Sequence, residues 1–212
     1  MTAGPCREPI DPVRFISNRS SGRMGYAVAR AAAEAGADVM LISGPTALEL
    51  PDRVRCEQVS TARQMHTAVM RELAGTDIFI GTAAVADYAC NVSVNQKIKK
   101  SDAGMTLILE PTPDILADVA KSERVPFTVG FAAETERVLE YARQKLISKQ
   151  LDLIAANQVG ENQGFESEEN HLQVIWHEGS VDLGLASKEK LARELVAIIA
   201  RRFHEKHTHQ TH

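Results

Sequence analysis

The stretch of residues 61–82, TARQMHTAVMRELAGTDIFIGT, decides the fold because it joins a helix to a strand. The apolar side chains of its first part recur at helical spacing and form one stripe: Met65, Ala68, Val69 and Leu73. The run Asp77–Thr82 that follows is short and apolar, which predicts a buried strand. A helix followed at once by a buried strand is typical of a parallel sheet that helices cover.

The same alternation continues on both sides of this stretch. Further apolar runs predict three more strands: Asp38–Ser43, Pro126–Ala132 and Asp152–Ala156. The segments beside these strands predict three helices: Tyr26–Ala35, Pro113–Lys121 with its proline in the first turn, and Thr135–Lys149. Near the end, His171–His177 and Val181–Leu185 predict a β-hairpin, and Ser187 predicts the cap of a last helix. The pattern as a whole predicts an α/β fold with helices on both faces of a parallel sheet.

Two stretches interrupt the alternation, namely Met1–Gly22, which is rich in Pro, Arg and Ser, and the polar Asp87–Gly104. Long irregular segments inside a compact domain are usually functional or mobile. The sequence contains no internal repeat and no interdomain linker, so we expect residues 1–203 to form a single domain. Residues 204–212 hold four of the seven histidines, and we expect them to form a disordered His-rich tail.

The composition excludes several classes of protein. The chain has 212 residues, a formal net charge of −4, 44% hydrophobic residues and 5% aromatic residues, which indicates a globular core of Ala, Val, Ile and Leu. A mildly acidic chain is a poor general binder of nucleic acid, and no apolar run approaches the roughly 20 residues that span a bilayer. The three cysteines (Cys6, Cys56 and Cys90) lack metal-type spacing, and the start lacks a signal peptide, which indicates the cytoplasm.

The segment Asn18–Gly25, NRSSGRMG, has the features of an anion site because it precedes an Ala-rich helix. Free N–H groups and the positive end of the helix dipole favour anions there. The small residues Ser20, Ser21 and Gly22 let phosphate oxygens approach the backbone. The segment matches neither a Walker A loop nor the G-x-G-x-x-G fingerprint. An ordinary Ser N-cap before a core helix is the alternative interpretation.

The segment Gly81–Tyr88, GTAAVADY, directly follows the predicted strand 77–82. Ligands in open α/β sheets bind at the carboxyl ends of strands, and small residues there expose backbone groups to a flat base, a ribose or an acyl group. Asp87 is suited to hold a ribose hydroxyl or a metal ion. The alternative is close packing of a helix on the strand, with Asp87 as an N-cap.

Cations and one aromatic ring complete the candidate site. Lys97–Lys100, KIKK, places three cations on an irregular segment that can close over a polyphosphate, although a solvated charge run is the commoner case. Glu110–Ile115 places a helix start after a predicted strand. Phe131 is suited to stack on a base, or else belongs to the core. Lys145 and Lys149 are spaced i, i+4 and share one helix face, with a solvated face as the alternative.

Five segments occur in an order that is more specific than any one of them: Ala3–Arg14, Ile16–Gly22, Ala83–Tyr88, Lys97–Lys100 and Gly130–Thr135. In this order they closely resemble the phosphopantothenoylcysteine synthetases of the bacterial type. The likeness extends from about Ala3 to the last helix. It implies a Rossmann-like, three-layer α/β fold with a mostly parallel sheet, helices on both faces, and a β-rich extension for dimerisation and a flap.

The resemblance implies a phosphopantothenate–cysteine ligase that makes an amide between 4′-phosphopantothenate and cysteine in coenzyme A synthesis. Bacterial members use CTP and Mg²⁺ as co-substrate and cofactor. The carboxylate attacks the α-phosphate and gives an acyl-cytidylate and pyrophosphate, after which the amine of cysteine displaces CMP. Because the nucleotide supplies good leaving groups, the protein mainly has to orient the substrates and place positive charge beside the phosphates. Because Mg²⁺ usually keeps waters and substrate phosphates as ligands, no protein metal cage is expected.

The resemblance also implies roles for individual residues. Asn18 and Lys97 are the implied catalytic residues: Asn18 orients the acyl intermediate, and Lys97 acts on the phosphates from a flap. The implied CTP contacts are Gly81, Thr82, Ala83, Asp87, Lys97, Pro113, Asp114, Ile115, Leu116, Phe131, Lys145 and Lys149. The turn Ser20–Gly22 fits a phosphate cradle on physical grounds.

The resemblance has two departures and implies two partners. Cys6 stands where the family usually has Thr, which puts a loop contact in doubt. The chain begins at the end of the expected first strand, so we expect an excised or a free-standing domain.

In many bacteria a flavin-dependent phosphopantothenoylcysteine decarboxylase domain precedes this one. Members of the family form homodimers, for which Asp87–Glu110 is the expected interface and the late hairpin the second candidate.

Two other functions remain as alternatives. An NAD(P)-dependent reductase would require a glycine fingerprint followed about 20 residues later by an acidic residue. Asp38 is roughly placed, but the glycines do not match. A non-catalytic nucleotide-binding module would tolerate changes of Asn18 and Lys97 without loss of any activity.

Overall fold

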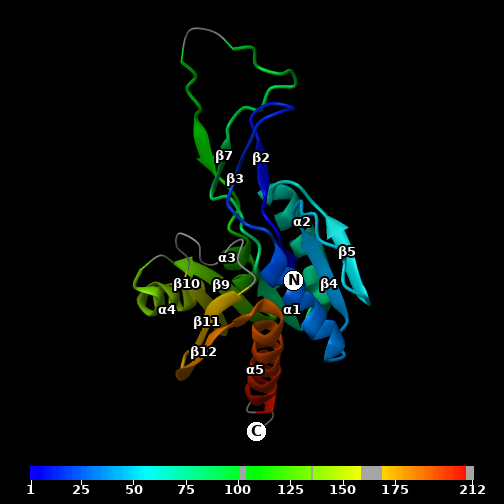
Figure 1. Cartoon of the computed structure of the whole chain (residues 1–212), viewed down its shortest axis with the longest axis vertical. Helices are drawn as coiled ribbons and strands as arrows, with labels where there is room; N and C mark the ends of the chain where they lie inside the picture. The colour runs from blue at the N-terminus through cyan, green and yellow to red at the C-terminus, as the bar shows by residue number, and fades with distance from the viewer. Residues whose placement is uncertain (101–103, 135, 159–168, 209–212) are drawn as a thin grey trace.

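A mostly parallel sheet forms the centre of the molecule, as the sequence predicts. The computed structural model describes residues 1–100, 104–134, 136–158 and 169–208. Within them, the largest sheet has eight strands in the order β12-β11-β10-β9-β6-β1-β4-β5 (Figure 1). These strands are β1 (Thr2–Ala3), β4 (Val39–Ser43), β5 (Val54–Gln58), β6 (Ile78–Gly81), β9 (Phe127–Glu134), β10 (Leu153–Gln158), β11 (Glu169–Trp176) and β12 (Gly179–Ser187). The six neighbouring strands β10, β9, β6, β1, β4 and β5 are parallel to one another. The predicted late hairpin adds β11 and β12, which run antiparallel.

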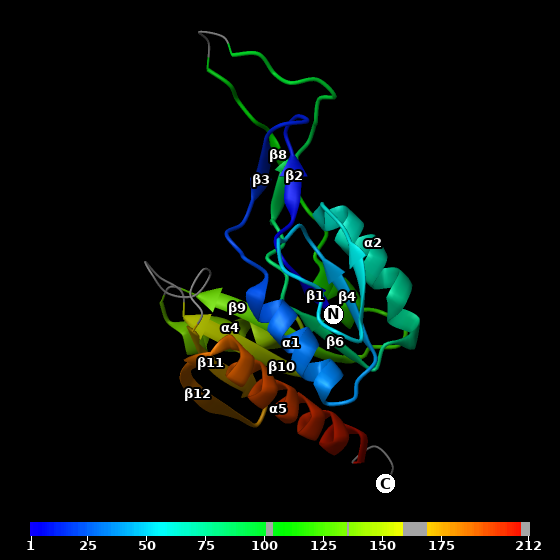
Figure 2. The ribbon, with the colours of Figure 1, turned by 45° about the vertical axis from the view of Figure 1, so that its right-hand side comes forward.

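Helices cover both faces of this sheet and make three layers. One face of the sheet carries α1 (Arg23–Glu34) and α5 (Lys188–Thr208) (Figure 2). The other face carries α2 (Ala62–Glu72), α3 (Ile115–Ala120) and α4 (Val138–Ser148). A short 3-10 turn, η1 (Leu73–Gly75), follows α2. Adjacent residues of β6 show the division. Ile80 packs with α1 and α5, whereas Phe79 packs with α2 and α3. The predicted α/β architecture is therefore confirmed.

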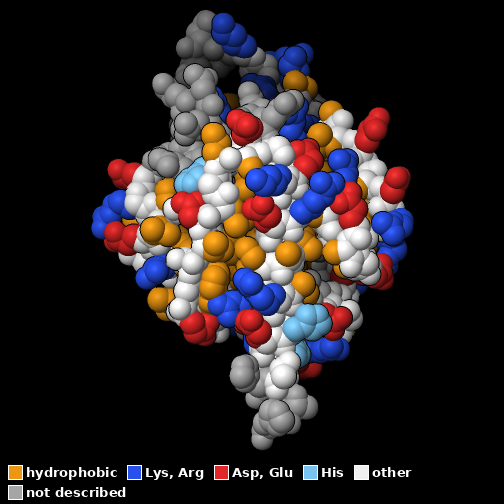
Figure 3. All heavy atoms as spheres, turned by 60° about the horizontal axis from the view of Figure 1, so that its bottom comes forward, with side chains coloured by type: hydrophobic (Ala, Val, Ile, Leu, Met, Phe, Trp, Pro, Cys, Tyr) orange, Lys and Arg blue, Asp and Glu red, His pale blue; other side chains and the backbone are white. Residues whose placement is uncertain are grey.

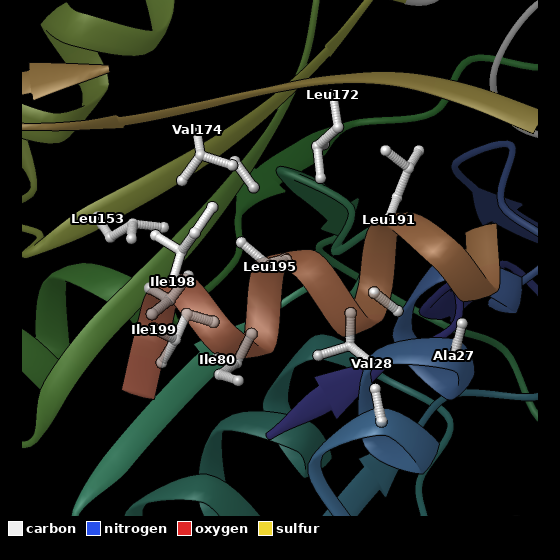
Figure 4. Packing of buried hydrophobic residues seen from close by; sticks show 14 of the residues in the cluster. Ala27, Val28, Ile80, Leu153, Leu172, Val174, Leu191, Leu195, Ile198 and Ile199 are labelled. Atoms are coloured by element: carbon white, nitrogen blue, oxygen red, sulfur yellow. The ribbon is translucent and has the colours of Figure 1, made fainter. Parts of the chain in front are cut away.

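The core beneath α5 is largely aliphatic, although it also contains the buried Phe127. Leu191, Leu195 and Ile198 extend from α5 toward Leu172 and Val174 of β11 and Leu153 of β10, with Val28 of α1 and Ile80 below (Figure 4). Burying one Leu or Ile side chain contributes about 1.5–3 kcal/mol, so this helix holds the antiparallel hairpin firmly on the parallel sheet.

The starts of two predicted helices differ from the sequence analysis, and one strand was missed. Pro113 lies before the helix rather than in its first turn, because Asp114 caps α3 by accepting a hydrogen bond from the Ala117 N–H at 3.1 Å. The helix predicted from Thr135 begins at Val138, and Thr135 lies outside the described residues. Strand β5 escaped prediction because it lies at the sheet edge, where its sequence VRCEQ is largely polar.

Most described residues of the two stretches predicted to be irregular lie in an extension at the carboxyl side of the sheet, whereas Thr2–Ala3 form β1 of the central sheet and Gly22 caps α1. The extension contains β2 (Arg7–Pro9) paired with β3 (Phe15–Ser17), and β7 (Tyr88–Cys90) paired with β8 (Leu109–Pro111), both antiparallel (Figure 1). A buried glutamate joins this extension to the body, since Oε1 of Glu8 accepts a hydrogen bond from the Ala62 N–H at 2.7 Å. The resemblance implied such a β-rich extension, whereas the composition alone did not.

Helix α5 continues past the point where we expected a disordered tail to begin. Ser187 caps it as predicted, accepting a hydrogen bond from the Lys190 N–H at 3.3 Å. The expectation for residues 204–208 is wrong, because the last turns are held by local contacts. The Thr208 hydroxyl donates to the His204 carbonyl at 2.8 Å, and the His207 ring lies 4.2 Å from the Phe203 ring. The last four residues, including His209 and His212, lie outside the described part of the chain.

The face at the end opposite the extension mixes charges of both signs. Lys and Arg side chains alternate there with Asp and Glu, and hydrophobic side chains reach the surface between them (Figure 3). Across the described residues, no helix combines the length and the apolar character that crossing a membrane requires.

Candidate functional site

Two cavities lie at the carboxyl ends of the central strands. The strand order reverses between β1 and β6, with β4 and β5 continuing on one side and β9 and β10 on the other. Loops that leave such a switch point diverge and form the crevice in which open α/β sheets bind ligands. We name the two spaces the α1 cavity, of about 140 Å³, and the α3 cavity, of about 450 Å³.

The α1 cavity lies at the N-terminus of α1. Its described lining consists of Ser20–Gly25, Thr82–Ala84, Phe131–Ala133, Asn157, Asn170 and Lys188. Gly22 caps the helix at a φ of 77°, which L side chains rarely adopt, and a Cβ there would lie 2.7 Å from Cγ2 of Thr46. Ser20 Oγ accepts a hydrogen bond from the Gly22 N–H at 3.2 Å. The turn predicted as a phosphate cradle therefore borders a cavity, and the first N–H groups of α1 begin there.

A second glycine brings the helix close to the sheet. A Cβ on Gly25 would lie 2.5 Å from Oγ1 of Thr82 and 2.6 Å from Cβ of Ala3. Only a residue without a side chain lets α1 start this near the ends of β1 and β6. The Gly22 and Gly25 positions therefore have different duties, one in the turn and the other in packing.

The α3 cavity collects most of the residues expected to contact the nucleotide. Its described lining consists of Thr2, Phe79, Gly81, Ala83, Val85, Asp87, Pro111, Thr112, Pro113, Asp114, Ile115, Leu116, Phe131, Lys145 and Lys149. All the expected contacts are among them except Thr82 and Lys97. Residues from four separate loops and helices thus meet at one place, as the carboxyl ends of parallel strands require.

Lys145 of α4 and Lys149, which follows that helix, are fixed at the wall of the α3 cavity. Lys149 forms an ion pair with Asp114, and Lys145 Nζ donates to the Phe131 carbonyl at 2.9 Å. Partial burial acts to raise the pKa of Asp114, but hydrogen bonds from Lys149 and the Ala117 N–H outweigh it and lower that pKa below its ordinary value. Asp114 is therefore a stable anion that holds a cation beside the cavity.

The two cavities adjoin each other. Ala83 and Phe131 line both, and Thr82 lines the α1 cavity rather than the α3 cavity. Ligand groups in the two spaces would therefore both lie against Ala83 and Phe131.

Asn18 lies next to this junction without lining either cavity. Its Nδ2 donates to the Val85 carbonyl at 2.9 Å, and Val85 belongs to the α3 cavity wall. The neighbouring Cys6 is part of the core beneath the loop, where burial, reinforced by the charge of Glu8, raises the pKa of the thiol to about 12. A thiol of this kind is inert, so the departure at Cys6 changes packing rather than chemistry.

The structure does not bring Lys97 to either cavity. The lysine is exposed in the segment between β7 and β8, and the residue after it is clamped at the β2–β3 turn. The Ile98 N–H donates to Oδ2 of Asp11 at 3.1 Å, and Nη2 of Arg14 donates to the Ile98 carbonyl at 2.6 Å. Asp11 is buried, which acts to raise its pKa, but three backbone N–H groups and Arg14 lower that pKa to about 2.

The sequence analysis missed three polar residues of the α1 cavity: Asn157, Asn170 and Lys188. Asn157 follows the predicted strand 152–156, so its place at a strand end was a usable signal. Asn170 and Lys188 come from the antiparallel hairpin and the start of α5. No sequence pattern indicates that these elements border the same cavity as residues 20–25.

Comparison with known proteins relates nearly the whole chain to one family. The model of the DNA/pantothenate metabolism flavoprotein C-terminal domain matches residues 1–203. The coenzyme A biosynthesis bifunctional protein CoaBC of Vibrio cholerae serotype O1 is 51% identical over 203 residues, covering 94% of this chain and 51% of that protein. The protein of the same name in Escherichia coli strain K12 is 49% identical over 211 residues, covering 97% and 52%. The chain spans about half the length of these curated relatives.

Solved structures agree with this relationship. The crystal structure of the C-terminal domain of a coenzyme A biosynthesis bifunctional protein CoaBC has a TM-score of 0.82 and 39% identity, covering 96% of this chain and 94% of that one. The DNA/pantothenate metabolism flavoprotein from Streptococcus pneumoniae has a TM-score of 0.81 at 23% identity, covering 94% and 96%. At that identity the second likeness concerns the fold alone.

Proposed function

This chain belongs to the family of the DNA/pantothenate metabolism flavoprotein C-terminal domain, and from that premise we propose that it is a CTP-dependent phosphopantothenate–cysteine ligase. It joins 4′-phosphopantothenate to L-cysteine in the synthesis of coenzyme A. Relatives named for coenzyme A biosynthesis at 51% and 49% identity support this pathway. Because those relatives are bifunctional and about twice as long, we further propose that the native protein also carries a flavin-dependent decarboxylase domain and acts in the cytoplasm.

The observation that carries the proposal is the pair of adjoining cavities. A ligase of this type must hold an acid and a nucleotide so that a carboxylate meets an α-phosphate. The α3 cavity has the size and the cations for a nucleotide, and the smaller α1 cavity has a helix N-terminus and Lys188 for an anionic acid. Their shared wall at Ala83 and Phe131 is the point at which the two substrates would react.

The reaction has two balanced steps. The carboxylate oxygen of phosphopantothenate attacks the α-phosphorus of CTP, the bond to the bridging oxygen breaks, and pyrophosphate leaves with the electron pair. The amine nitrogen of cysteine then attacks the acyl carbon of the acyl-cytidylate, CMP leaves, and the nitrogen loses a proton. Both leaving groups are stabilised anions, so the chain contributes orientation and positive charge rather than a proton relay.

Each wall of the α3 cavity suits one part of CTP. The Phe131 ring and the backbone at Gly81 and Ala83 fit the base and ribose, and Lys145 and Lys149 fit the phosphates. Mg²⁺ would supply further neutralisation of the triphosphate. Among the described residues no group of three His, Cys, Asp or Glu side chains could hold a metal ion. Asp87 is its most suitable protein ligand, since Asp114 is paired with Lys149.

The two implied catalytic residues act from outside the cavities. The amide of Asn18, which donates to the Val85 carbonyl in this structure, would turn from it to donate to an acyl oxygen of the bound intermediate. Lys97 acts only when its segment leaves the clamp at Asp11 and Arg14 and closes over the phosphates. We therefore assign Asn18 to the acyl intermediate and Lys97 to a mobile flap.

Pyrophosphate release tests the proposal directly. The chain is incubated with phosphopantothenate, CTP and Mg²⁺, with and without cysteine. We expect pyrophosphate in both reactions, and free CMP only when cysteine completes the turnover. Substituting ATP for CTP tests the choice of nucleotide, and absence of pyrophosphate with either nucleotide would overturn the proposal. Asn18→Asp should lower product formation while CTP still binds, whereas the exposed Asn91→Asp should behave like the parent chain.

A further inference from the structure

A histidine of α2 holds the short helix that borders the α3 cavity. The Nε2 atom of His66 lies 2.9 Å from Oδ2 of Asp118, which belongs to α3. Because a carboxylate only accepts hydrogen bonds, the Nε2–H group of His66 is the donor. Both side chains are partly buried, so water and salt screen this contact less than they screen a pair on the open surface. The contact therefore ties α3 to α2.

Helix α3 depends on support from outside because it has only six residues. A helix of this length is marginal alone and keeps its place through packing. Its residues Ile115 and Val119 belong to the same buried cluster as Met65 and Val69 of α2. Apolar burial is non-directional and leaves such a helix able to turn about its axis. A hydrogen bond to the side chain of Asp118 is directional and fixes that rotation.

The rotation of α3 matters because its start forms one wall of the α3 cavity. Asp114, Ile115 and Leu116 all line that cavity. The side chain of Leu116 packs closely on the ends of β6 and β9. A Cβ on Gly81 would lie 3.2 Å from Cδ2 of Leu116, and a Cβ on Gly130 would lie 3.6 Å from its Cδ1. A small rotation of α3 would therefore change the shape of the cavity.

A chain of contacts leads from His66 to the cation beside the cavity. The Asp118 N–H donates to the Asp114 carbonyl at 3.0 Å, and the Asp114 carboxylate forms an ion pair with Lys149. The Ala117 N–H donates to the same carboxylate at 3.1 Å. The residue that His66 holds is thus hydrogen-bonded to the residue that holds Lys149.

From this geometry we propose that His66 is a positioning residue of the nucleotide site. It lines neither cavity and acts through Asp118, which fixes the helix that presents Asp114 and Lys149 to the triphosphate. The inference rests on the proposed function and adds to it a residue, outside both cavities, on which the affinity for the nucleotide depends. The acid substrate, which we place in the α1 cavity, does not depend on it.

The test replaces His66 by leucine, which has a similar volume and cannot donate a hydrogen bond. The Kd for CTP, measured by isothermal titration calorimetry, should rise about three- to tenfold, the effect of losing one hydrogen bond. The KM for phosphopantothenate should stay within about twofold. His66→Gln keeps an N–H donor and should restore most of the affinity for CTP. The amide of Ala117 should exchange with solvent faster in His66→Leu than in the parent chain.

A matched control breaks the same kind of pair at a distance from α3. The Nε2 atom of His171 lies 2.8 Å from Oδ1 of Asp182 in the late hairpin, where both side chains are again partly exposed. His171→Leu should change neither the Kd for CTP nor the exchange of the Ala117 amide. A double variant isolates the pair itself. On top of Asp118→Ala, His66→Leu should have no further effect on the Kd, because the hydrogen bond is already lost.

The outcomes separate the two proposals. If the parent chain binds CTP but releases no pyrophosphate, the proposed function fails while the Kd and exchange measurements still decide the role of His66. A parent chain that does not bind CTP would overturn both. If CTP binds to His66→Leu as tightly as to the parent chain, the assignment of His66 is wrong.

A general loss of structure gives a different result. An undiminished effect of His66→Leu on top of Asp118→Ala would overturn the assignment. An equal rise of the phosphopantothenate KM together with a lower Tm would do the same. Should His66→Leu not fold, Asp118→Ala removes the same hydrogen bond from the other side and is held to the same expectation.

Discussion

At the scale of single residues, the pair formed by Asp114 and Lys149 links stability to nucleotide binding. The lowered pKa of Asp114 means that its carboxyl is charged at a lower pH in the folded chain than in the unfolded chain. The pair's contribution is therefore complete above the ordinary Asp pKa and is lost as the pH falls through the lowered value. Since both side chains are a third to a half exposed, that contribution is small, about 1 kcal/mol or less.

Replacing Lys149 by methionine should therefore affect function more than stability. We expect the KM for CTP to rise about tenfold, because a phosphate contact is lost, and the KM for phosphopantothenate to stay unchanged. Acid unfolding followed by circular dichroism should lose the part of its pH dependence that comes from Asp114. Lys121→Met, at the exposed C-terminal end of α3, serves as the control. An unchanged KM for CTP would remove Lys149 from the nucleotide site.

At the scale of elements, the β2–β3 turn holds the flap in an outward position. The buried Asp11 carboxylate accepts hydrogen bonds from the N–H groups of Val13, Arg14 and Ile98, and also from Nε of Arg14. Its pKa of about 2 implies that the clamp stays charged at any pH above that value and is lost only in strong acid. A neutral amide cannot accept at both oxygen positions.

Asp11→Asn should consequently release the segment that carries Lys97. The amide of Ile98 should exchange with solvent about tenfold faster, while amides in β10, such as that of Ile154, keep their protection. If the clamp opposes closure, CTP should also bind more tightly, because less free energy is spent in opening it. Hydrogen exchange at Ile98 that matches the parent chain would contradict the clamp.

The elements also show how far the sequence predicts the structure. The strands and helices with a clear period, such as Asp77–Thr82 and Thr61–Leu73, lie within one residue of their predicted ends. Strand ends then located most of the α3 cavity, because parallel strands finish at one edge. The strands of the extension could not be found in this way, since each has three residues and is held by partners distant in sequence, such as Asp11 with Ile98. Lys188 was missed for the same reason, because its place at the α1 cavity depends on tertiary packing.

At the scale of the whole molecule, the extension exposes hydrophobic side chains that a single copy leaves in water. The exposed large residues on it are Val13, Phe15, Tyr88, Val92, Val94, Met105, Leu107, Ile108 and Leu109. Paired strands this short are marginal alone, and exposed apolar side chains on them favour a partner. We propose that the partner is a second copy, which a two-fold axis would place so that each extension covers the other.

A matched pair of substitutions decides where the copies meet. Ile108→Lys places a charge on the extension at a residue that is 65% exposed, and Leu185→Lys does the same on β12 at a residue that is 69% exposed. The proposal predicts that sedimentation equilibrium finds the parent chain and Leu185→Lys as dimers and Ile108→Lys as a monomer. Dissociation by Leu185→Lys alone would move the interface to the late hairpin. A dimer through the extension would also limit how far Lys97 can move. The segment that carries Lys97 runs from β7 to β8, and both strands would be held by the partner.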